Sequence, residues 1–322
     1  FNRKIAERSF LYQLVGNATF SVDTFFFISG LLVVYLFLKT EKVKFEKLKK
    51  SRLASFCRIS SVKATFFFGY RFLRLTPVYL IIIMFTEVSM KYIYNGSVFS
   101  PGLSDHINCN KFWWRNILYV NNFYPLNEIC LMWSWYLAND FQFYIAAIII
   151  LILSTRFLKT SVYMCCFLLA ISWAVSIFIS LHYNYTHKVS EPFESFDVLY
   201  DKPWQRFGPY CMGAWIASVL TNFIIVFGVT SGQLSRIPTS VYVSFGHTGK
   251  LITWGLSLVW LVLSCCWKLS KPIDNFLSFK AFIPLSRLSY CAYLIHPVVM
   301  MITSFQCDGP MHLKHGMIVR KI

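Results

Sequence analysis

Two arginines at the start of an apolar run are the residues of this sequence best suited to chemistry. Arg71 and Arg74 lie three positions apart in the string Tyr-Arg-Phe-Leu-Arg-Leu-Thr-Pro-Val-Tyr, residues 70–79. This spacing predicts that both guanidinium groups share one face of a helix. Each group is always charged and offers planar donors that match a phosphate or a carboxylate. The pair therefore indicates either an anion-binding site or two anchors at the membrane–water interface, where flanking Arg is common.

A second set of polar residues interrupts an apolar run further along the chain, at 132–144. A helix there would place Trp135, Asn139 and Gln142 on one face and Asp140 on the neighbouring face. A carboxylate and two amides inside a membrane span must face protein or water rather than lipid. They predict a polar reaction cavity or, alternatively, hydrogen bonds that hold neighbouring helices together.

A third polar set contains the chain's best candidate for a general base. Ser289, Tyr293 and His296 recur at i, i+4 and i+7 and predict one face of a helix. His296 precedes Pro297, where a helix commonly bends and backbone carbonyl groups are freed. The imidazole is therefore a candidate acid–base group, or else it only satisfies the interrupted backbone.

A carboxylate early in the first apolar run needs a positive partner, because an isolated charge in hydrocarbon is costly. This carboxylate belongs to Asp23. We expect it to neutralise an arginine elsewhere in the bundle, and Arg71 and Arg74 are the candidate partners.

Helices that cross a membrane must position these residues. The chain has 322 residues, of which 56% are hydrophobic and only 14% are charged, whereas soluble domains carry about a quarter charged residues. The sequence thus predicts an all-α, polytopic integral membrane helical bundle. Its net charge of +17 then reflects Lys and Arg in cytoplasmic loops near anionic lipid, not a nucleic-acid interface. The ten cysteines form no Cys-x-x-Cys pair, so no metal site is expected.

The apolar runs set the expected topology. They predict spans at 20–38, 75–93, 131–153, 162–182, 207–229, 251–267 and 283–305. The loop 39–63 carries nine Lys or Arg against two Glu, so we expect it on the cytoplasmic side. The loops 94–130 and 183–205 then lie outside, in the lumen or at the cell exterior.

These outside loops have the features of segments in an oxidising compartment. Asn95 and Asn184 each begin a glycosylation sequon. Cys109 and Cys130 lie in the first outside loop, and we expect them to form a disulfide.

The charge pattern conflicts with this span count after residue 206. The loop 268–280 should lie outside, yet it carries three Lys against one Asp, which favours the inside. One more crossing between 206 and 250 would resolve the conflict. We therefore predict seven to eight spans and a missing segment near Leu220; the alternative is that this short loop is an exception to the charge rule.

Five strings taken together resemble one family. They are Ser-Val-Asp-Thr-Phe-Phe-Phe-Ile-Ser-Gly-Leu-Leu (21–32), Arg-Phe-Leu-Arg-Leu-Thr-Pro-Val-Tyr (71–79), Trp-Ser-Trp-Tyr-Leu-Ala-Asn-Asp-Phe-Gln-Phe-Tyr (133–144), Lys-Pro-Trp-Gln-Arg-Phe-Gly-Pro-Tyr (202–210) and Pro-Leu-Ser-Arg-Leu-Ser-Tyr-Cys-Ala-Tyr-Leu-Ile-His-Pro (284–297). In this order they resemble the nose-resistant-to-fluoxetine proteins of invertebrates, within the acyltransferase type 3 superfamily. The resemblance implies a bundle of about ten spans that transfers an acyl group, from acyl-CoA on the cytoplasmic side, to a hydroxyl acceptor. It also implies that the Arg-x-x-Arg at 71–74 holds the anionic part of the donor.

The resemblance further implies a catalytic histidine in a span upstream of 21–32. This sequence lacks that span, so we expect the chain to be an incomplete form. We expect a segment at 1–19 in the lumen or outside, a membrane domain at 20–305 and a polar tail at 306–322. The protein would be a multi-pass protein of the endoplasmic reticulum or the plasma membrane.

The resulting hypothesis is a membrane O-acyltransferase with acyl-CoA as donor substrate, no bound cofactor, and an acceptor hydroxyl on a lipid, sugar or small molecule. Its candidate residues are Arg71, Arg74 and Tyr79 for the donor, Asn139, Asp140 and His296 for catalysis, and Trp135 and Gln142 for the substrate. The alternative is a non-catalytic lipid or drug transport protein, which would use the same polar residues as a pathway through the bundle.

Overall fold

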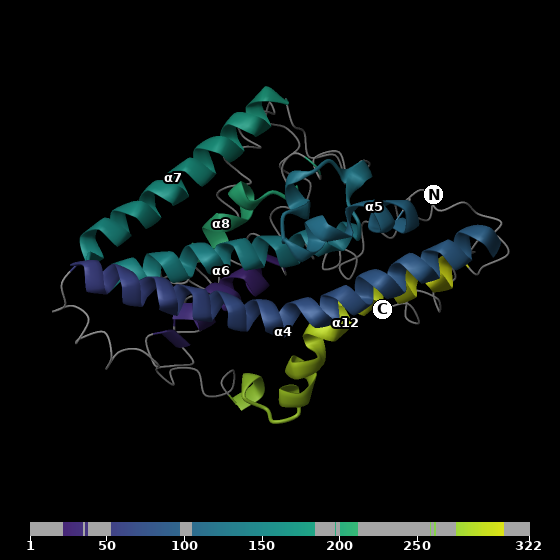
Figure 1. Cartoon of the computed structure of the whole chain (residues 1–322), viewed down its shortest axis with the longest axis horizontal. Helices are drawn as coiled ribbons and strands as arrows, with labels where there is room; N and C mark the ends of the chain where they lie inside the picture. The colour runs from purple at the N-terminus through teal and green to yellow at the C-terminus, as the bar shows by residue number, and fades with distance from the viewer. Residues whose placement is uncertain are drawn as a thin grey trace. The chain divides into compact units, whose positions relative to one another are not determined.

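The computed structural model describes residues 22–34, 36–37, 53–96, 105–183, 197, 200–211, 258, 261 and 275–305. The regular elements in these ranges are helices (Figure 1). A short apolar helix, Val22–Val34, comes first. It is followed by α4 (Leu53–Gly96), α5 (Asp105–Ile117), the 3-10 turns η1 (Asn121–Phe123), η2 (Leu126–Glu128) and η3 (Met132–Ser134), α6 (Trp135–Ser154), α7 (Leu158–His182), α8 (Pro203–Cys211) and α12 (Phe282–Phe305).

Four of the described helices are long and apolar enough to cross a membrane: Arg58–Asn95, Met132–Ser154, Lys159–His182 and Phe282–Ser304. Three of them coincide within a few residues with the spans expected at 131–153, 162–182 and 283–305. The protein is therefore an integral membrane protein of helices, as the composition predicts. The spans expected at 207–229 and 251–267 lie almost wholly outside the described residues, so the total of seven to eight stays a prediction.

The helix α4 differs from the expected loop and span. It begins at Leu53, ten residues before the end of the cytoplasmic loop expected at 39–63, so that loop boundary is wrong. Lys and Arg are good helix formers, and their number indicates the side of the membrane rather than local structure. With 44 residues, α4 is about 66 Å long, roughly twice the thickness of the hydrocarbon core. Arg71 and Arg74 thus lie near its middle.

The chain divides into two compact units. Unit 1 contains residues 1–68 and 139–274, and unit 2 contains residues 69–138 and 275–322. The helices α4 and α6 each continue from one unit into the other.

Unit 1 is held by helix packing around a small apolar core. The helix α8 packs on α7 (Figure 1), and the rings of Phe26 and Phe143 meet edge to face at 5.4 Å. Gly30 allows an especially close approach, because a Cβ atom there would lie only 2.5 Å from the backbone oxygen of Tyr210 in α8. A side chain at this position would force the two helices apart.

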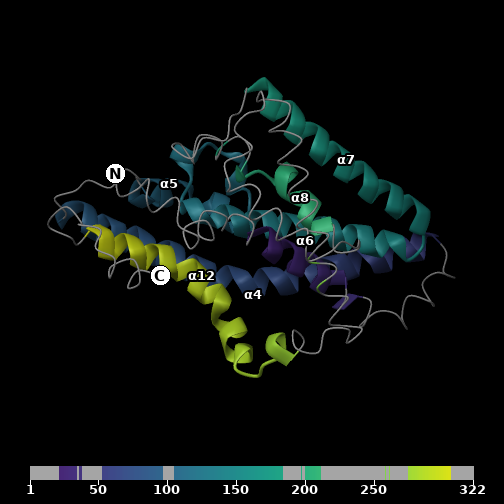
Figure 2. The ribbon, with the colours of Figure 1, turned by 180° about the vertical axis from the view of Figure 1, so that it is seen from behind.

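Unit 2 contains α5, α12 and the second half of α4. Figures 1 and 2 show α12 running beside α4, and the Tyr290 hydroxyl donates to the Leu75 carbonyl oxygen at 3.0 Å. A disulfide joins Cys109 in α5 to Cys130, which confirms the expected pairing. It closes the segment between α5 and α6 into a loop.

Candidate functional site

The predicted site residues are divided between the two units. Unit 2 holds Arg71, Arg74, Tyr79, Trp135 and His296, and unit 1 holds Asn139, Asp140 and Gln142. Each group has its own network of hydrogen bonds.

In unit 2, the phenol of Tyr119 lies beside Thr76 of α4 and within the influence of the Arg71 charge. Arg71 is half-buried and Arg74 is exposed. Further along the same helix, Thr76 Oγ1 lies 3.2 Å from the Tyr119 hydroxyl. Burial raises the pKa of the Tyr119 phenol, while the Thr76 hydrogen bond and then the Arg71 charge act in the opposite direction. Arg71 is therefore near enough to favour negative charge beside Tyr119.

Tyr119 is held in an unusual backbone conformation. Its φ angle is +57°, a left-handed conformation that is rare for residues with a side chain and costs on the order of 1–3 kcal/mol. The side chain is 1% exposed, and its ring packs on those of Phe72 and Tyr79 at 6.2 and 5.9 Å. Sequence reasoning missed this residue, because nothing in its local string distinguishes it from other tyrosines of a loop.

Tyr79 is fixed by buried amides. Asn116 Nδ2 donates to the Tyr79 hydroxyl at 2.8 Å and to the Cys130 carbonyl oxygen at 2.7 Å. Asn121 Nδ2 donates to Ser134 Oγ at 2.9 Å. All four side chains that take part, Tyr79, Asn116, Asn121 and Ser134, are at most 1% exposed. The amide NH₂ groups of Asn116 and Asn121 thus find acceptors within the protein, whereas the side-chain oxygens of both residues are buried without a partner among the described residues.

The helix α12 brings the candidate base into unit 2. The Tyr293 hydroxyl donates to the carbonyl oxygen of Trp133. One turn further, His296 is exposed, and its Nδ1 lies 3.1 Å from the Ala292 carbonyl oxygen in the same helix. A carbonyl oxygen can only accept, so Nδ1 carries a proton in this contact, and in the neutral imidazole Nε2 is then the acceptor.

In unit 1, the partner of Asp23 is not the one expected. Both carboxylate oxygens of Asp23 accept hydrogen bonds from Nη1 of Arg206, at 2.8 and 3.0 Å. The pair is fully buried, with side-chain exposures of 1% and 2%. Arg206 also donates to the Tyr200 carbonyl oxygen at 3.3 Å and lies 4.3 Å over the Tyr200 ring. The hypothesis that Asp23 pairs with Arg71 or Arg74 is therefore wrong, because α8 places Arg206 against the first helix.

The predicted polar residues of α6 also contact other elements of unit 1. The Ser29 hydroxyl donates to Asp140 Oδ1 at 2.6 Å. Asn139 Nδ2 donates to the backbone oxygen of Asp201 at 2.8 Å. Both α6 residues are buried, whereas Gln142 is half-buried. These contacts link α6 to the first helix and to the segment before α8.

Asp201 and Lys202 form a further ion pair that sequence reasoning did not single out. Lys202 Nζ donates to Asp201 Oδ2 at 3.2 Å and lies 3.6 Å from Asp197 Oδ1. Burial raises the pKa of Asp201 to about 7, although the Lys202 charge opposes the rise. A carboxyl group with this pKa can exchange a proton near neutral pH. The string 202–210 was notable only for its family resemblance, and no pattern within it indicates an ion pair.

The two networks differ in what they can do chemically. Unit 2 contains guanidinium and phenol groups, which suit binding of an anion, and the imidazole group of His296, which suits proton transfer. The buried charges Asp23 and Arg206, and Asp201 and Lys202, form ion pairs within unit 1, which suits a rigid framework. Of the sequon residues, Asn95 is exposed at the end of α4 and Asn184 lies outside the described residues, so glycosylation stays a prediction.

Comparisons with known proteins agree on one family. The family model described as an acyltransferase domain matches residues 3–310. Nose resistant to fluoxetine protein 6 of Caenorhabditis elegans is 27% identical over 350 aligned positions, which cover 95% of this chain and 41% of the relative. The chain thus spans about two fifths of that relative's length. No solved structure matches this chain.

The alignment with this relative is longer than the chain itself, at 350 positions against 322 residues. The relative therefore carries residues within the matched region that this chain lacks. The placement of such a segment near Leu220 stays a prediction.

Proposed function

The chain belongs to the family of membrane proteins built on this acyltransferase domain, and from that premise we propose that it transfers an acyl group from acyl-CoA to a hydroxyl acceptor. The observation that carries the proposal is the family match over residues 3–310. The arrangement in unit 2 supports it, because it supplies an anion-binding group and a candidate base.

The donor is proposed to bind at the arginine pair of α4. Coenzyme A carries phosphates, and the guanidinium group binds phosphate through two parallel hydrogen bonds. Arg74 is exposed and Arg71 is half-buried, so both charges are within reach of a ligand on this face. Tyr79 is fully buried, so its proposed role is to hold α4 against α5 through the Asn116 hydrogen bond.

The proposed reaction exchanges one acyl bond for another. The acceptor oxygen bonds to the acyl carbon, the carbon–sulfur bond of the thioester breaks, and the sulfur leaves as the CoA thiolate. The hydroxyl proton passes to a base, for which His296 Nε2 is the candidate within the described residues. Its Nδ1–H contact with Ala292 would hold the required tautomer.

Asn139, Asp140 and Gln142 belong to unit 1, and their proposed roles rest on that unit's own hydrogen bonds. Asn139 and Asp140 are tied to Asp201 and Ser29 by hydrogen bonds. Trp135 and Gln142 lie on the same helix and are proposed to contact the acceptor. The identity of the acceptor, as a lipid, sugar or small molecule, belongs to the proposal as well.

The test is binding of acyl-CoA by the purified protein in detergent, measured by titration calorimetry. The R71A/R74A variant should lose saturable binding. Arg71→Lys should also lose most of it although the charge is kept, because the planar donor pair is lost. The matched control is R58A/K159A, which removes two exposed positive charges elsewhere and should bind as the wild type does.

Two outcomes would contradict the proposal. Equal acyl-CoA affinity of wild type and R71A/R74A would remove the donor site from the arginine pair. Binding of acyl-CoA without release of CoA in the presence of alcohol acceptors, by wild type and His296→Ala alike, would favour the alternative of a non-catalytic lipid or drug transport protein.

A further inference from the structure

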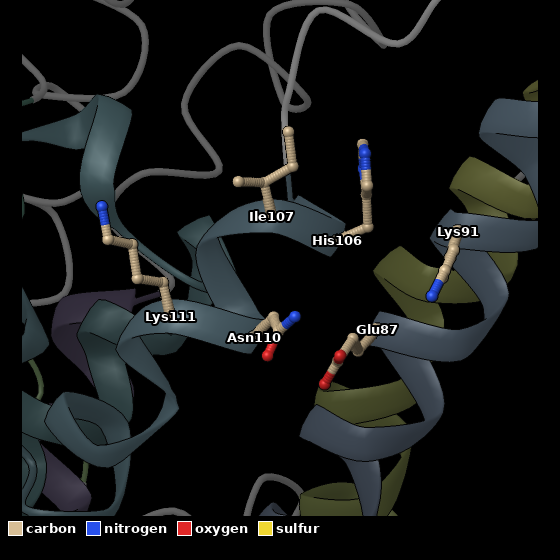
Figure 3. A pocket seen from close by; sticks show the side chains of 6 residues that line it. All are labelled: Glu87, Lys91, His106, Ile107, Asn110 and Lys111. Atoms are coloured by element: carbon tan, nitrogen blue, oxygen red, sulfur yellow. The ribbon is translucent and has the colours of Figure 1, made fainter.

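A cavity of about 440 Å³ lies in unit 2 between the end of α4 and the start of α5. Figure 3 shows Glu87 and Lys91 on α4 facing α5, with Asn110 opposite Glu87. The lining side chains are polar with one exception, and they are Glu87, Lys91, His106, Ile107, Asn110 and Lys111. The proposed acyl transfer uses none of them.

The position of this cavity is set by the membrane span of α4. The candidate span ends at Asn95, so Lys91 lies about one helical turn inside its end. Eight residues, 97–104, connect α4 to α5. The disulfide of Cys109 lies on α5, and disulfides persist on the oxidising side of a membrane. The cavity therefore lies where the span reaches the non-cytoplasmic surface.

The exposed face of α5 has the composition of a helix at a membrane surface. Ile107, Lys111 and Trp114 recur at i, i+4 and i+7 and so share one face. Ile107 is 56% and Trp114 42% exposed, while Asp105 and Cys109 on the other face are buried. Trp and Lys are the residues enriched where hydrocarbon meets water, and an amphipathic helix of this kind lies in that interface.

The cavity lining carries groups that are complementary to both charges of a phospholipid headgroup. The ammonium group of Lys91 and the amide of Asn110 are donors that suit a phosphate. Lys111 also lines the cavity and adds a second positive charge, with its ammonium group turned away from Glu87 (Figure 3). The carboxylate of Glu87 suits a positively charged amine. The ring of His106 is stabilised by packing 4.7 Å from the Tyr94 ring, which keeps this side of the cavity in place.

We propose that this cavity binds the phosphodiester headgroup of a phospholipid from the non-cytoplasmic leaflet, with Lys91 and Asn110 on the phosphate and Glu87 on the headgroup amine. Ile107 and Trp114 contact the hydrocarbon chains beside it. The proposal is independent of acyl transfer. The cavity lies at the C-terminal end of α4, whereas the basic segment lies at its N-terminal end.

The experiment measures lipid binding to the purified chain in detergent by native mass spectrometry. The probe is palmitoyl-oleoyl phosphatidylethanolamine. Wild type should bind it at least tenfold more tightly than K91A/K111A, which corresponds to about 1.4 kcal/mol. Both lysines are exposed, so their replacement should leave the thermal midpoint unchanged. The R58A/K159A variant removes the same charge elsewhere and should bind the lipid as the wild type does.

Three further arms separate the possible ligands. Diacylglycerol with the same chains lacks the phosphate and should bind at least tenfold more weakly. Soluble glycerophosphoethanolamine should compete poorly, because it lacks the chains. Glu87→Gln should lower the preference for phosphatidylethanolamine over phosphatidylglycerol several-fold.

Opposite results would overturn the proposal. If K91A/K111A binds the lipid as tightly as wild type, or diacylglycerol binds equally well, the cavity does not recognise a headgroup. If the soluble headgroup competes as well as the lipid, the ligand is a free phosphodiester. An unchanged lipid preference in Glu87→Gln would remove the proposed amine contact.

Discussion

Neutralising the carboxylate of Asp23 should destabilise the protein far more than a comparable change at the surface. In Asp23→Asn the shape of the side chain is kept and one oxygen can still accept from Arg206, but the negative charge and the second of the two acceptor oxygens are lost. The guanidinium group of Arg206 stays buried, because the side chain is only 2% exposed. A buried charge without its counter-charge is among the most costly defects in a folded protein.

The size of the effect follows from what Arg206 keeps. Removing one partner of a buried pair costs roughly 3–5 kcal/mol. Arg206 retains its hydrogen bond to the Tyr200 carbonyl oxygen and its position over the Tyr200 ring, which places the cost at the lower end, about 3 kcal/mol. At about 1.5 °C for each kcal/mol in a chain of 322 residues, the thermal midpoint should fall by roughly 4–5 °C.

The assay is thermal unfolding in detergent, followed by intrinsic tryptophan fluorescence. The control is Glu128→Gln, which breaks the ion pair with Arg115. The Nη1–Oε2 distance of this pair is 2.9 Å, but the Glu128 side chain is 43% exposed, so the change should cost less than about 1 kcal/mol. The D23N/R206Q double variant should lose less than the sum of the two single variants, because it removes both charges. If Asp23→Asn lowers the thermal midpoint no more than Glu128→Gln does, the stabilising role of the buried Asp23–Arg206 pair is refuted.

Three further predictions use the same thermal assay. Gly30→Ala should destabilise the protein by about 1–3 kcal/mol, because the new Cβ meets the backbone of α8. The control is Gly69→Ala, where a Cβ would have nothing within 4 Å, and it should be neutral or stabilising by up to about 1 kcal/mol. Equal effects of the two changes would exclude the close approach at Gly30. Reduction of the Cys109–Cys130 disulfide, with 21 residues of separation, should cost about 3 kcal/mol, and an unchanged midpoint would argue against its contribution. The pKa of Asp201 is raised to about 7, so the folded state keeps a proton that the unfolded state releases, and stability should fall as the pH rises from the ordinary value of a carboxyl group to about 7; Asp201→Asn should remove this slope, and a variant that keeps it would show that another group causes it.

The helices of the membrane domain could be predicted from the sequence because their cause is local. A run of about 20 apolar residues is long enough to cross the bilayer whatever lies beside it, and the helices at 132–154, 159–182 and 282–304 follow those runs. The start of α4 could not be predicted in the same way. Charge indicated a loop at 39–63, but helix formation depends on the backbone and tolerates Lys and Arg.

The grouping of the site residues was predictable only in part. Arg71 and Arg74 share a helix face because the period of the helix requires it, and the disulfide followed from two cysteines in one outside loop. Tyr119 was not predictable, because its place beside Thr76 and Arg71 depends on a left-handed turn and on the disulfide-closed segment that carries it.

The amino-acid sequence by itself determined that this protein is a bundle of membrane helices of an acyltransferase family, because apolar length, charge and ordered motifs are properties of the chain. Only the tertiary structure decided which charges meet. Asp23 and Arg206 are 183 residues apart, and a carboxylate in an apolar run requires a positive partner without specifying which one. That choice is made by packing, since α8 approaches the first helix closely at Gly30 and so brings Arg206, rather than Arg71 or Arg74, to the buried carboxylate.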